Sequence, residues 1–286
     1  MNTVLAVAKS SRLVAPLTHG LDGRELVFSY GREIPKLDPE NCSYWMGGAF
    51  AYQLQFVGHA TELCSPGSNW LPSLDENVTG RKVHTGTLKD IAGGTDRLFV
   101  KPAEAKISSL PASAYTGKEV EAVFAAEGFT DGIQLQWTEG ILKMNFEHRF
   151  FVLDGEVLTG SPYLVDGVGY HLGIDRSRQS DAEVFLREVL DSQPDLMPPA
   201  FVVDVAMNEN TGNWVVIEAN RAWSSGLYGC DPTLALLAVD ASSHHESARW
   251  QWVPDAHLVE NIKTWNPIMV SDDSFEDSSS FFKFGS

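Results

Sequence analysis

Three oxygen-bearing side chains stand out in the segment FVVDVAMNENTGNWVVIEAN, residues 201–220. Asp204, Glu218 and Asn220 interrupt valine and isoleucine runs that otherwise indicate buried β-strands. The intervening NENTGN is rich in turn-forming residues, so the segment predicts an antiparallel hairpin. A turn centred on Thr211 places Asp204 opposite Glu218.

The same register separates the hairpin into two faces. Side chains alternate along a strand, so one face is predicted to be wholly apolar and the three polar side chains share the other. In this register Met207 faces Val215, and Val205 faces Ile217. The apolar face is predicted to comprise Val203, Val205, Met207, Val215, Ile217 and Ala219.

Two carboxylates across from each other are unfavourable on a half-buried sheet. Like charges directly opposite repel, and burial adds the cost of removing each carboxylate from water. We therefore expect a cation beside Asp204 and Glu218. A hard divalent ion fits best, because Mg2+ takes carboxylate oxygens together with water and phosphate oxygens.

The composition limits the partners of the chain. Its 286 residues carry a net charge of −17, which disfavours general binding to nucleic acid or to an anionic membrane. No apolar run is long enough to span a bilayer. Three cysteines, at spacings that match no zinc or disulfide framework, favour a reducing compartment, so we expect a cytoplasmic protein.

The elements that must position the hairpin become readable from residue 95 onward. RLFVKP, residues 97–102, predicts a strand that ends at Pro102. A helix follows in TGKEVEAVFAAEGF, where Thr116 and Glu119 have the spacing of a capping box. GIQLQW then predicts another strand. The pattern up to this point is strand, helix, strand.

Antiparallel strands and two more helices complete the predicted order. EHRFFVLDGEVLTGSPY predicts two strands joined at Asp154–Gly155, a dipeptide typical of tight hairpin turns. In SDAEVFLREVLDS, Ser180 and Glu183 predict a second capping box. After the acidic hairpin, Asp231–Pro232 predicts an N-cap and a first-turn proline for a last helix.

The chain is predicted to have three parts. Residues 1–85 hold scattered strand-like pieces, without the strand–glycine–helix opening of dinucleotide-binding domains, and form a small N-terminal domain. Residues 86–245 form the main domain. Residues 246–286 form an extension whose Ser/Asp-rich acidic tail is expected to be partly mobile.

Taken together, these motifs resemble the ATP-grasp superfamily, and in particular its small bacterial and phage members. The resemblance covers roughly residues 80–240 and depends on the order of FVKP with Lys101, EHRFFV with Arg149, and the acidic trio of the hairpin. It implies an α/β (α+β) fold in which two α+β lobes hold ATP between them, behind the small N-terminal domain.

The resemblance also implies an activity. Such enzymes transfer the γ-phosphoryl group of ATP to a carboxylate, and an amine or thiol then attacks the acyl phosphate. Two Mg2+ ions are expected, with Glu218 bridging them, Asp204 on one and Asn220 on the other. This role agrees with the shared face derived from the strand period.

Two cations are implied to contact the phosphates. Lys101 would bind the α- and β-phosphates, although a lysine at a strand end also commonly reaches for solvent. Arg149 would clamp the γ-phosphate or the acyl phosphate, a role that suits its fork of donors. The alternative for Arg149 is a structural ion pair with Glu147 on the same strand face.

The nucleotide is expected at QLQWTEG, a linker between the lobes. Gln136 and Trp137 would line the adenine, and Glu139 would accept hydrogen bonds from the ribose, unless it is merely solvated. Lys82 is the candidate for a second phosphate-binding lysine, with Arg81 an equal alternative.

The acceptor is expected along RAWSSGLYGCDP. Its candidate residues are Arg221, which would hold the substrate carboxylate, and Ser224, Ser225 and Tyr228. Alternatively, the aromatic residues of this segment pack a helix entry.

The phosphate loop departs from better-known relatives, because no glycine-rich stretch separates residues 101 and 116. Lys106, Ser108 and Ser109 are candidates to cover the phosphates instead. The acid and amine substrates, whether small molecules, peptides or proteins, are not identified. The oligomeric state is left open, with a homodimer as one candidate because many relatives pair as dimers.

Three functions remain open at this stage. The leading one is an ATP- and Mg2+-dependent carboxylate–amine ligase. The others are a phosphotransferase that acts on a non-carboxylate acceptor, distinguished by a stable phosphate ester product, and a non-catalytic module that binds a nucleotide or divalent ion. Lys101 and Arg149 argue against the last, since a structural ion has no need of them.

Overall fold

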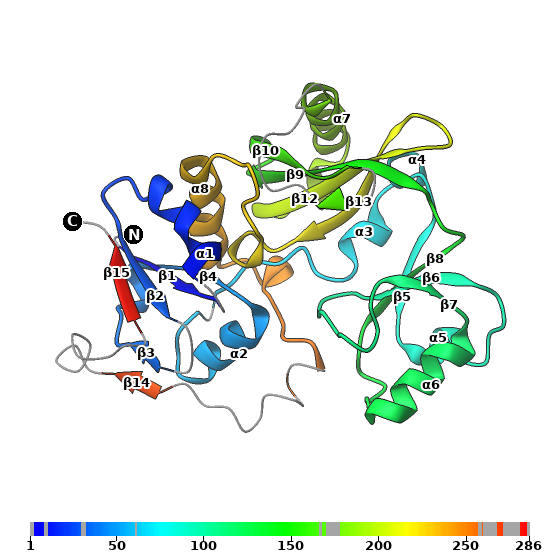
Figure 1. Cartoon of the computed structure of the whole chain (residues 1–286), viewed down its shortest axis with the longest axis horizontal. Coiled ribbons are helices and arrows are strands. Elements are labelled where there is room, and N and C mark those ends of the chain that lie inside the picture. Colours follow the sequence, from blue (N-terminus) through cyan, green and yellow to red (C-terminus); the bar gives the residue numbers. More distant parts are fainter. Residues whose placement is uncertain are drawn as a thin grey trace.

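The computed structural model contains an N-terminal domain and two further α+β units, a small lobe and a large lobe (Figure 1). It describes residues 3–8, 11–29, 33–60, 62–165, 168–169, 178–256, 259, 268–270 and 281–284. The fold class expected from the sequence, an α/β (α+β) fold with two lobes, is confirmed.

The N-terminal domain is built on a parallel sheet. Its strand order is β15-β2-β1-β4, from Phe281–Phe284, Glu25–Ser29, Thr3–Val7 and Cys42–Met46. β1, β2 and β4 are parallel, whereas β15 adds antiparallel to the edge at β2. After β4 comes α2 (Gly48–Phe56), with Gly47 as its N-cap, so a strand–glycine–helix step is present at β4.

Short helices connect and cover this sheet. A second, two-stranded sheet joins β3 (Glu33–Pro35) to β14 (Ile268–Val270) in parallel. Residues 271–280 of the acidic tail lie outside the described residues. The helical segments of this region are α1 (Ser11–Val14), η1 (Ala15–Gly20) and η2 (Pro39–Asn41). Two short helices that follow, α3 (Trp70–Ser73) and α4 (Glu76–Thr79), pack against the core of the large lobe instead.

The small lobe is a four-stranded sheet covered by two helices. The strand order is β5-β8-β6-β7, from Val83–Gly86, Leu135–Glu139, Leu98–Pro102 and Ser113–Tyr115. α5 (Leu88–Ile91) and α6 (Gly117–Glu127) pack over one face. The predicted capping box of Thr116 and Glu119 is confirmed, with both reciprocal hydrogen bonds present.

The large lobe is an antiparallel sheet in the order β11-β10-β9-β12-β13. Its strands are Val168–Gly169, Glu156–Val165, Met144–Leu153, Ala200–Asn208 and Trp214–Asn220. α7 (Gln179–Ser192) covers one face, above the sheet in Figure 1. The Asp154–Gly155 turn between β9 and β10 is confirmed, with both residues at positive φ.

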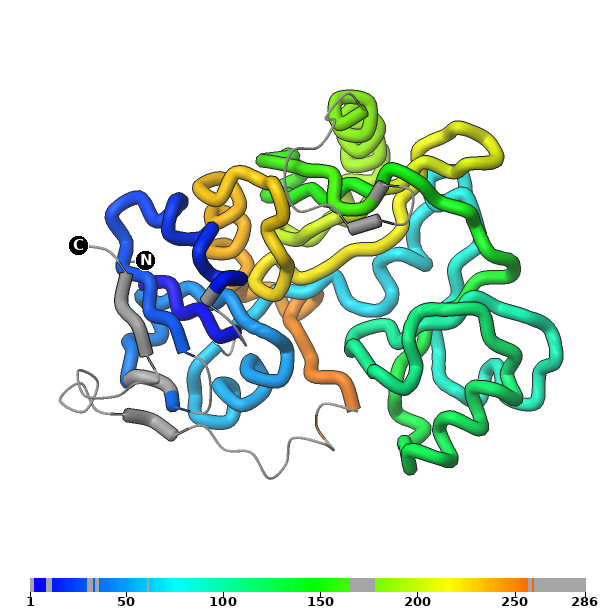
Figure 2. The backbone as a smooth tube through the Cα atoms, in the orientation of Figure 1, coloured from blue at the N-terminus to red at the C-terminus, as the bar shows by residue number. Residues whose placement is uncertain are grey.

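The other face of the large sheet meets the N-terminal domain. α8 (Pro232–Ser243) lies between them, and one apolar core joins residues of β1 and β2 to Phe151, Val202 and Leu236. Figure 2 shows the path: the chain leaves the N-terminal domain, builds the small lobe, then the large lobe, and returns through α8. The large lobe is therefore packed against the N-terminal domain.

The two helix starts in this half have different outcomes. Asp231 is the N-cap of α8 as predicted, and its carboxylate accepts from the backbone N–H groups of Thr233 and Leu234. The predicted capping box of Ser180 and Glu183 is wrong. α7 begins at Gln179, which places Ser180 inside the first turn, and Glu183 pairs with Arg187 instead.

The second half of the described chain also contains the short 3-10 helices η3 (Pro194–Leu196), η4 (Ala222–Ser224) and η5 (Ala248–Trp250). No helix within the described ranges is both long enough and apolar enough to cross a bilayer.

A glycine at the start of α6 sets the distance between α5 and α6. A β-carbon at Gly117 would lie 1.8 Å from the carbonyl oxygen of Ile91. We predict that Gly117→Ala destabilises the protein by about 1–3 kcal/mol, because backbone must move to admit the methyl group. Gly47→Ala is the matched control, since a β-carbon there meets nothing within 4 Å. Equal unfolding midpoints in urea for the two variants would contradict this packing.

Candidate functional site

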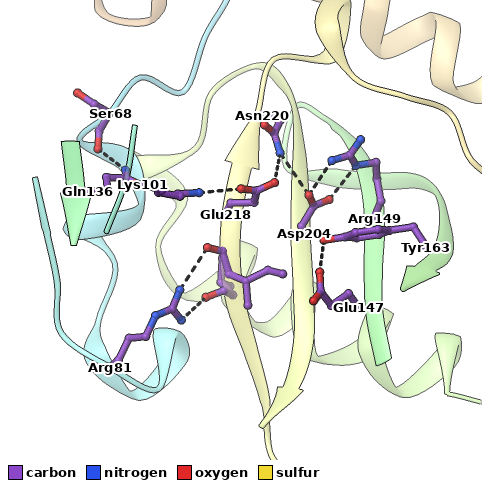
Figure 3. A network of polar contacts seen from close by, with 12 residues as sticks. Ser68, Arg81, Lys101, Gln136, Glu147, Arg149, Tyr163, Asp204, Glu218 and Asn220 are labelled. Atoms are coloured by element: carbon purple, nitrogen blue, oxygen red, sulfur yellow. Dashed lines mark hydrogen bonds and ion pairs between the residues drawn. The ribbon is translucent and has the colours of Figure 1, made fainter. Parts of the chain in front are cut away.

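A row of charged side chains crosses the large-lobe sheet. Arg149 on β9 pairs in register with Asp204 on β12, and Asp204 pairs with Glu218 on β13. Arg149 donates from Nε and Nη2 to the two oxygens of Asp204, at 2.9 and 2.7 Å. Three adjacent strands thus place one cation and two carboxylates side by side (Figure 3).

The small lobe completes the row with a second cation. Lys101, near the end of β6, donates from Nζ to Oε2 of Glu218 at 2.7 Å. Asn220 donates from Nδ2 to Oε1 of Glu218 at 2.9 Å and to Oδ2 of Asp204 at 3.2 Å. The predicted shared face of Asp204, Glu218 and Asn220 is present. The cations beside the two carboxylates are Lys101 and Arg149, whereas the sequence led us to expect a divalent ion there.

The ionisation of this row follows from its burial. Burial raises the pKa of Asp204 to about 7, against the opposing pull of Arg149, and the charge of Glu218 adds to the rise. Burial is the largest influence on Glu218 and disfavours its charged form as well, but the ion pair with Lys101 and the hydrogen bonds of Lys101, Asp204 and Asn220 together hold the pKa of Glu218 below its ordinary value. The two carboxylates are therefore not equivalent, and Asp204 is the more costly to ionise.

A β-bulge at Ile217 aims Glu218 toward the small lobe. Asp204 pairs with Glu218 as predicted, but Val205 pairs with Val216, one residue short of the predicted Ile217. Nearer the turn, Met207 consequently pairs with Trp214. The predicted pairs Met207–Val215 and Val205–Ile217 are wrong, because the extra residue shifts the register by one.

The bulge also changes the apolar face. Val203, Val205, Val216 and Ala219 pack on the α7 side of the sheet, while Val215 and Ile217 are absent from that core. We predicted that side chains alternate between the two faces without interruption along the whole of β13. This is wrong for the part of β13 between the hairpin turn and Ile217.

Arg81 stabilises the bulge. Its guanidinium donates to the carbonyl oxygens of Val216 and Ile217, each at 3.3 Å, and to that of Thr79 at 2.7 Å. Burial lowers the pKa of Arg81 to about 10. Of the two candidates for a second phosphate-binding cation, Arg81 is thus engaged by backbone, whereas Lys82 is exposed.

Two tyrosines lie beside Arg149 and were not singled out from the sequence as a pair. The guanidinium carbon of Arg149 lies 5.4 Å from the ring centre of Tyr163 and 5.0 Å from that of Tyr228, and the two rings stack. The hydroxyl of Tyr163 donates to Glu147 at 2.5 Å. The alternative of an Arg149–Glu147 ion pair is wrong, because each residue has a different partner.

The predicted nucleotide residues fall on two faces of β8. Gln136 pairs with Lys101 across β6 and shares its face, and its amide nitrogen donates to the carbonyl oxygen of Ser68 at 2.7 Å. Trp137 faces the α5 and α6 side, where it stacks on His84. Glu139, on the same side as Trp137, has a side chain that is 79% exposed.

The predicted acceptor residues have unequal surroundings. Ser225 is buried and donates to the carbonyl oxygen of Arg221 at 2.8 Å, whereas Ser224 is half-buried. Tyr228 is 42% exposed and has a left-handed backbone, with φ of 49°. Arg221 contacts Glu104 of the small lobe, at 2.9 Å from Nη2 to the carbonyl oxygen and 3.5 Å from Nη1 to the carboxylate.

The segment expected to cover the phosphates lies between β6 and β7. Lys106 and Ser108 are exposed and Ser109 is half-buried. Ile107 and Leu110, their neighbours, are buried in the small-lobe core and anchor the segment.

The donor set of the hairpin is suited to a hard cation. Among the described residues, no three His, Cys, Asp or Glu side chains are grouped to hold a metal ion. The trio instead combines two carboxylates with an amide, and Oδ1 of Asn220 accepts no hydrogen bond from the described residues. Oxygen donors of this kind match Mg2+ in the presence of phosphate.

Fold and site together define an ATP-grasp domain. The model of an ATP-grasp domain family, the second family of its clade, matches residues 78–238, more than half of the chain. The protein belongs to this family, which confirms the resemblance seen in the motifs.

Three solved structures are similar to the chain at low sequence identity. D-alanine–D-alanine ligase from Coxiella burnetii has a TM-score of 0.52 at 11% identity, over 85% of this chain and 95% of that one. D-alanine–D-alanine ligase from Bacillus anthracis, complexed with ATP, has a TM-score of 0.47 at 13% identity, over 85% and 97%. ATP-grasp ligase PsnB, complexed with minimal precursor, has a TM-score of 0.42 at 12% identity, over 84% and 99%. No curated protein sequence matches the chain.

The two carboxylates of the row are predicted to differ in their effect on stability. Asp204→Asn should lower the free energy of unfolding by only about 1 kcal/mol, because burial makes the charge of Asp204 costly and an amide oxygen still accepts one hydrogen bond from Arg149. Glu218→Gln should cost about 2–3 kcal/mol, since it removes the charge that pairs with Lys101, and one amide oxygen cannot accept from both Lys101 and Asn220. Urea unfolding at about pH 7.5, above the raised pKa of Asp204, measures both. A larger loss in Asp204→Asn than in Glu218→Gln would contradict this assignment.

Proposed function

We propose that the protein is an ATP- and Mg2+-dependent ligase that activates a carboxylate as an acyl phosphate and couples it to an amine. The observation that carries the proposal is the contact between Lys101 of the small lobe and Glu218 of the large lobe, 2.7 Å apart. A lysine suited to binding phosphate thus faces oxygen ligands suited to binding a metal ion, at the place where the two lobes meet.

The side chains of the trio suit the metal. Glu218, Asn220 and Asp204 would hold Mg2+, with Glu218 shared between two ions. Bound Mg2+ neutralises the charge that develops on the phosphate oxygens during transfer. The chain contributes oxygen donors on one rigid sheet face, so little rearrangement of the backbone is needed to present them.

The cations of the row suit the phosphates. Lys101 and Arg149 form ion pairs with Glu218 and Asp204. With Mg2+ and ATP bound together, Lys101 and Arg149 would pair with phosphates, and Glu218 and Asp204 would hold Mg2+. The number of charge pairs is preserved, so the exchange avoids leaving any buried charge alone.

The remaining residues complete the nucleotide and acceptor regions of this proposal. Gln136, on the face of Lys101, would contact the nucleotide through its side chain, and Trp137 through its backbone. Glu139 stays a candidate for the ribose and Lys82 for a phosphate. Tyr228, accessible beside Arg149, and the half-buried Ser224 would contact the acceptor, with Ser225 shaping the turn that holds them.

Nucleotide binding gives the first test. Calorimetric titration of ATP should show binding only with Mg2+ present, and Mg2+ alone should give no heat, because all four carboxylate oxygens of the pair are already engaged. Glu218→Gln should weaken the binding of Mg2+ and ATP by about tenfold or more, the loss expected for a charge-assisted contact.

A matched control is Glu188→Gln, an exposed glutamate on α7 at the far face of the sheet. It should bind as the unaltered protein does. ATP binding that survives excess chelator, or equal weakening in both variants, would overturn the proposed site.

The chemistry has its own test, with hydroxylamine as the amine. Hydroxylamine traps acyl phosphates as hydroxamates, so a panel of amino acids and short peptides should include an acid that gives a hydroxamate together with ADP. Arg149→Lys, which keeps the charge but loses the fork, should slow the reaction by roughly a hundredfold with a smaller effect on ATP affinity.

The product distinguishes the alternatives. A stable phosphate ester with no hydroxamate would support the phosphotransferase. ATP binding without turnover on any acceptor would support a non-catalytic nucleotide module.

A further inference from the structure

A second ion pair joins the two lobes beside the pair of Lys101 and Glu218. Nη2 of Arg221 donates to the carbonyl oxygen of Glu104 at 2.9 Å, and Nη1 lies 3.5 Å from Oε2 of the same residue. Glu104 follows β6 and Arg221 follows β13, so the contact connects the ends of the two strands that carry Lys101 and Glu218. It therefore forms a second bridge between the same two strands.

The two bridges are parallel and opposite in sign. Each joins residues 117 positions apart, and each member of the second bridge lies three positions after a member of the first. The first places its cation on the small lobe, whereas the second places its cation on the large lobe. The two cations therefore have different carboxylate partners, Glu218 for Lys101 and Glu104 for Arg221. An anion that draws Lys101 away from Glu218 leaves the pair of Arg221 and Glu104 intact.

The surroundings hold Arg221 in place. The guanidinium carbon lies 5.2 Å from the ring centre of Trp223 and 5.7 Å from that of Trp252, within the range of cation–π contacts. Only 16% of the Arg221 side chain and 15% of the Glu104 side chain are exposed. Burial lowers the pKa of Arg221 and raises that of Glu104, so each charge depends on the other, with Asp255 also close by.

We propose that Glu104 and Arg221 are positioning residues that keep Lys101 opposite the metal-binding hairpin while ATP binds. The inference rests on the proposed function, since that function breaks the Lys101–Glu218 contact. Once Lys101 has turned to a phosphate, the first bridge no longer holds the lobes, whereas Glu104 and Arg221 keep their contact. Arg221 therefore acts through Lys101 rather than on the substrate carboxylate.

The decisive experiment separates affinity from stability. Arg221→Met should lower both the melting temperature and the affinity for Mg2+ and ATP, because it leaves Glu104 buried without its cation. The double variant Glu104→Gln/Arg221→Met also removes the buried charge of Glu104, so the melting temperature should recover part of the way toward that of the unaltered protein. The affinity should stay roughly tenfold below it, within the range of coupled contacts.

Arg221→Lys gives the rescue. It retains the charge and one bond to Glu104, and should restore part of the affinity lost in Arg221→Met. The matched control is Glu183→Gln/Arg187→Met, which removes an ion pair on α7, away from the site. It should leave the affinity unchanged.

Amide hydrogen exchange tests the contact between Glu104 and Arg221 without any nucleotide, and so independently of the proposed function. In the free Glu104→Gln/Arg221→Met variant, amides of residues 103–110 should exchange faster than in the unaltered protein, because the segment has lost its bond to the large lobe. Unchanged exchange there would overturn the bridge itself.

Two further outcomes would overturn the inference in different ways. If affinity recovers together with melting temperature in the double variant, the pair only stabilises the fold. If the unaltered protein fails to bind Mg2+ and ATP at all, the proposed function fails and the inference fails with it.

Discussion

The structure of the site depends on keeping two neighbouring carboxylates neutralised on one face of a sheet. Asp204 and Glu218 are paired in register, where like charges repel and burial raises the cost. Each carboxylate is neutralised by a different cation. Arg149, on the next strand, pairs with Asp204, and Lys101, from the other lobe, pairs with Glu218. The sheet supplies Arg149 by register alone, whereas the contact with Lys101 requires the two lobes to be correctly placed. The same row is thus both a candidate catalytic arrangement and a constraint on how the lobes meet.

Irregular structure is what makes this row possible. A regular β13 would continue the strict alternation, but the extra residue at Ile217 interrupts the ladder and leaves carbonyl groups that need donors. Arg81 supplies those donors from the segment just before β5, on the small-lobe side of the chain. Gly80 precedes it at φ of 64°, and a β-carbon there would lie 2.7 Å from Val215. The close approach of this turn to β13 therefore needs a glycine, and it brings Arg81 to the bulge that orients Glu218.

Sequence patterns predicted the parts of this arrangement that depend on residues close together in the chain. The period of two in a strand is enough to put Asp204, Glu218 and Asn220 on one face, and capping residues located the starts of α6 and α8. Predictions based on the same patterns went wrong at Ile217 and Ser180, where a bulge and an earlier helix start override the pattern. Lys101 and Glu218 were each found by motif, but their contact spans 117 residues and no periodicity determines it. The role of Arg81 at the bulge has no signal in the sequence, because that role exists only once the bulge is formed.

The overall negative charge of the protein means that, under the proposed function, a nucleoside triphosphate must be bound by short-range contacts. With a net charge of −17, the molecule as a whole repels a nucleoside triphosphate, and long-range steering works against association. The favourable interactions must therefore be short-ranged and assembled from the few cations that face inward. Lys101 and Arg149 are held by carboxylates, so their charges are desolvated and oriented by the fold, as the proposed function requires of groups that bind phosphate. An anionic ligand carrying Mg2+ offers both halves of the row a replacement partner at once, whereas either ion alone would strand a buried charge. Under the proposed function, selectivity of the site for the metal–nucleotide pair would follow from the cost of leaving one member of the row unpaired.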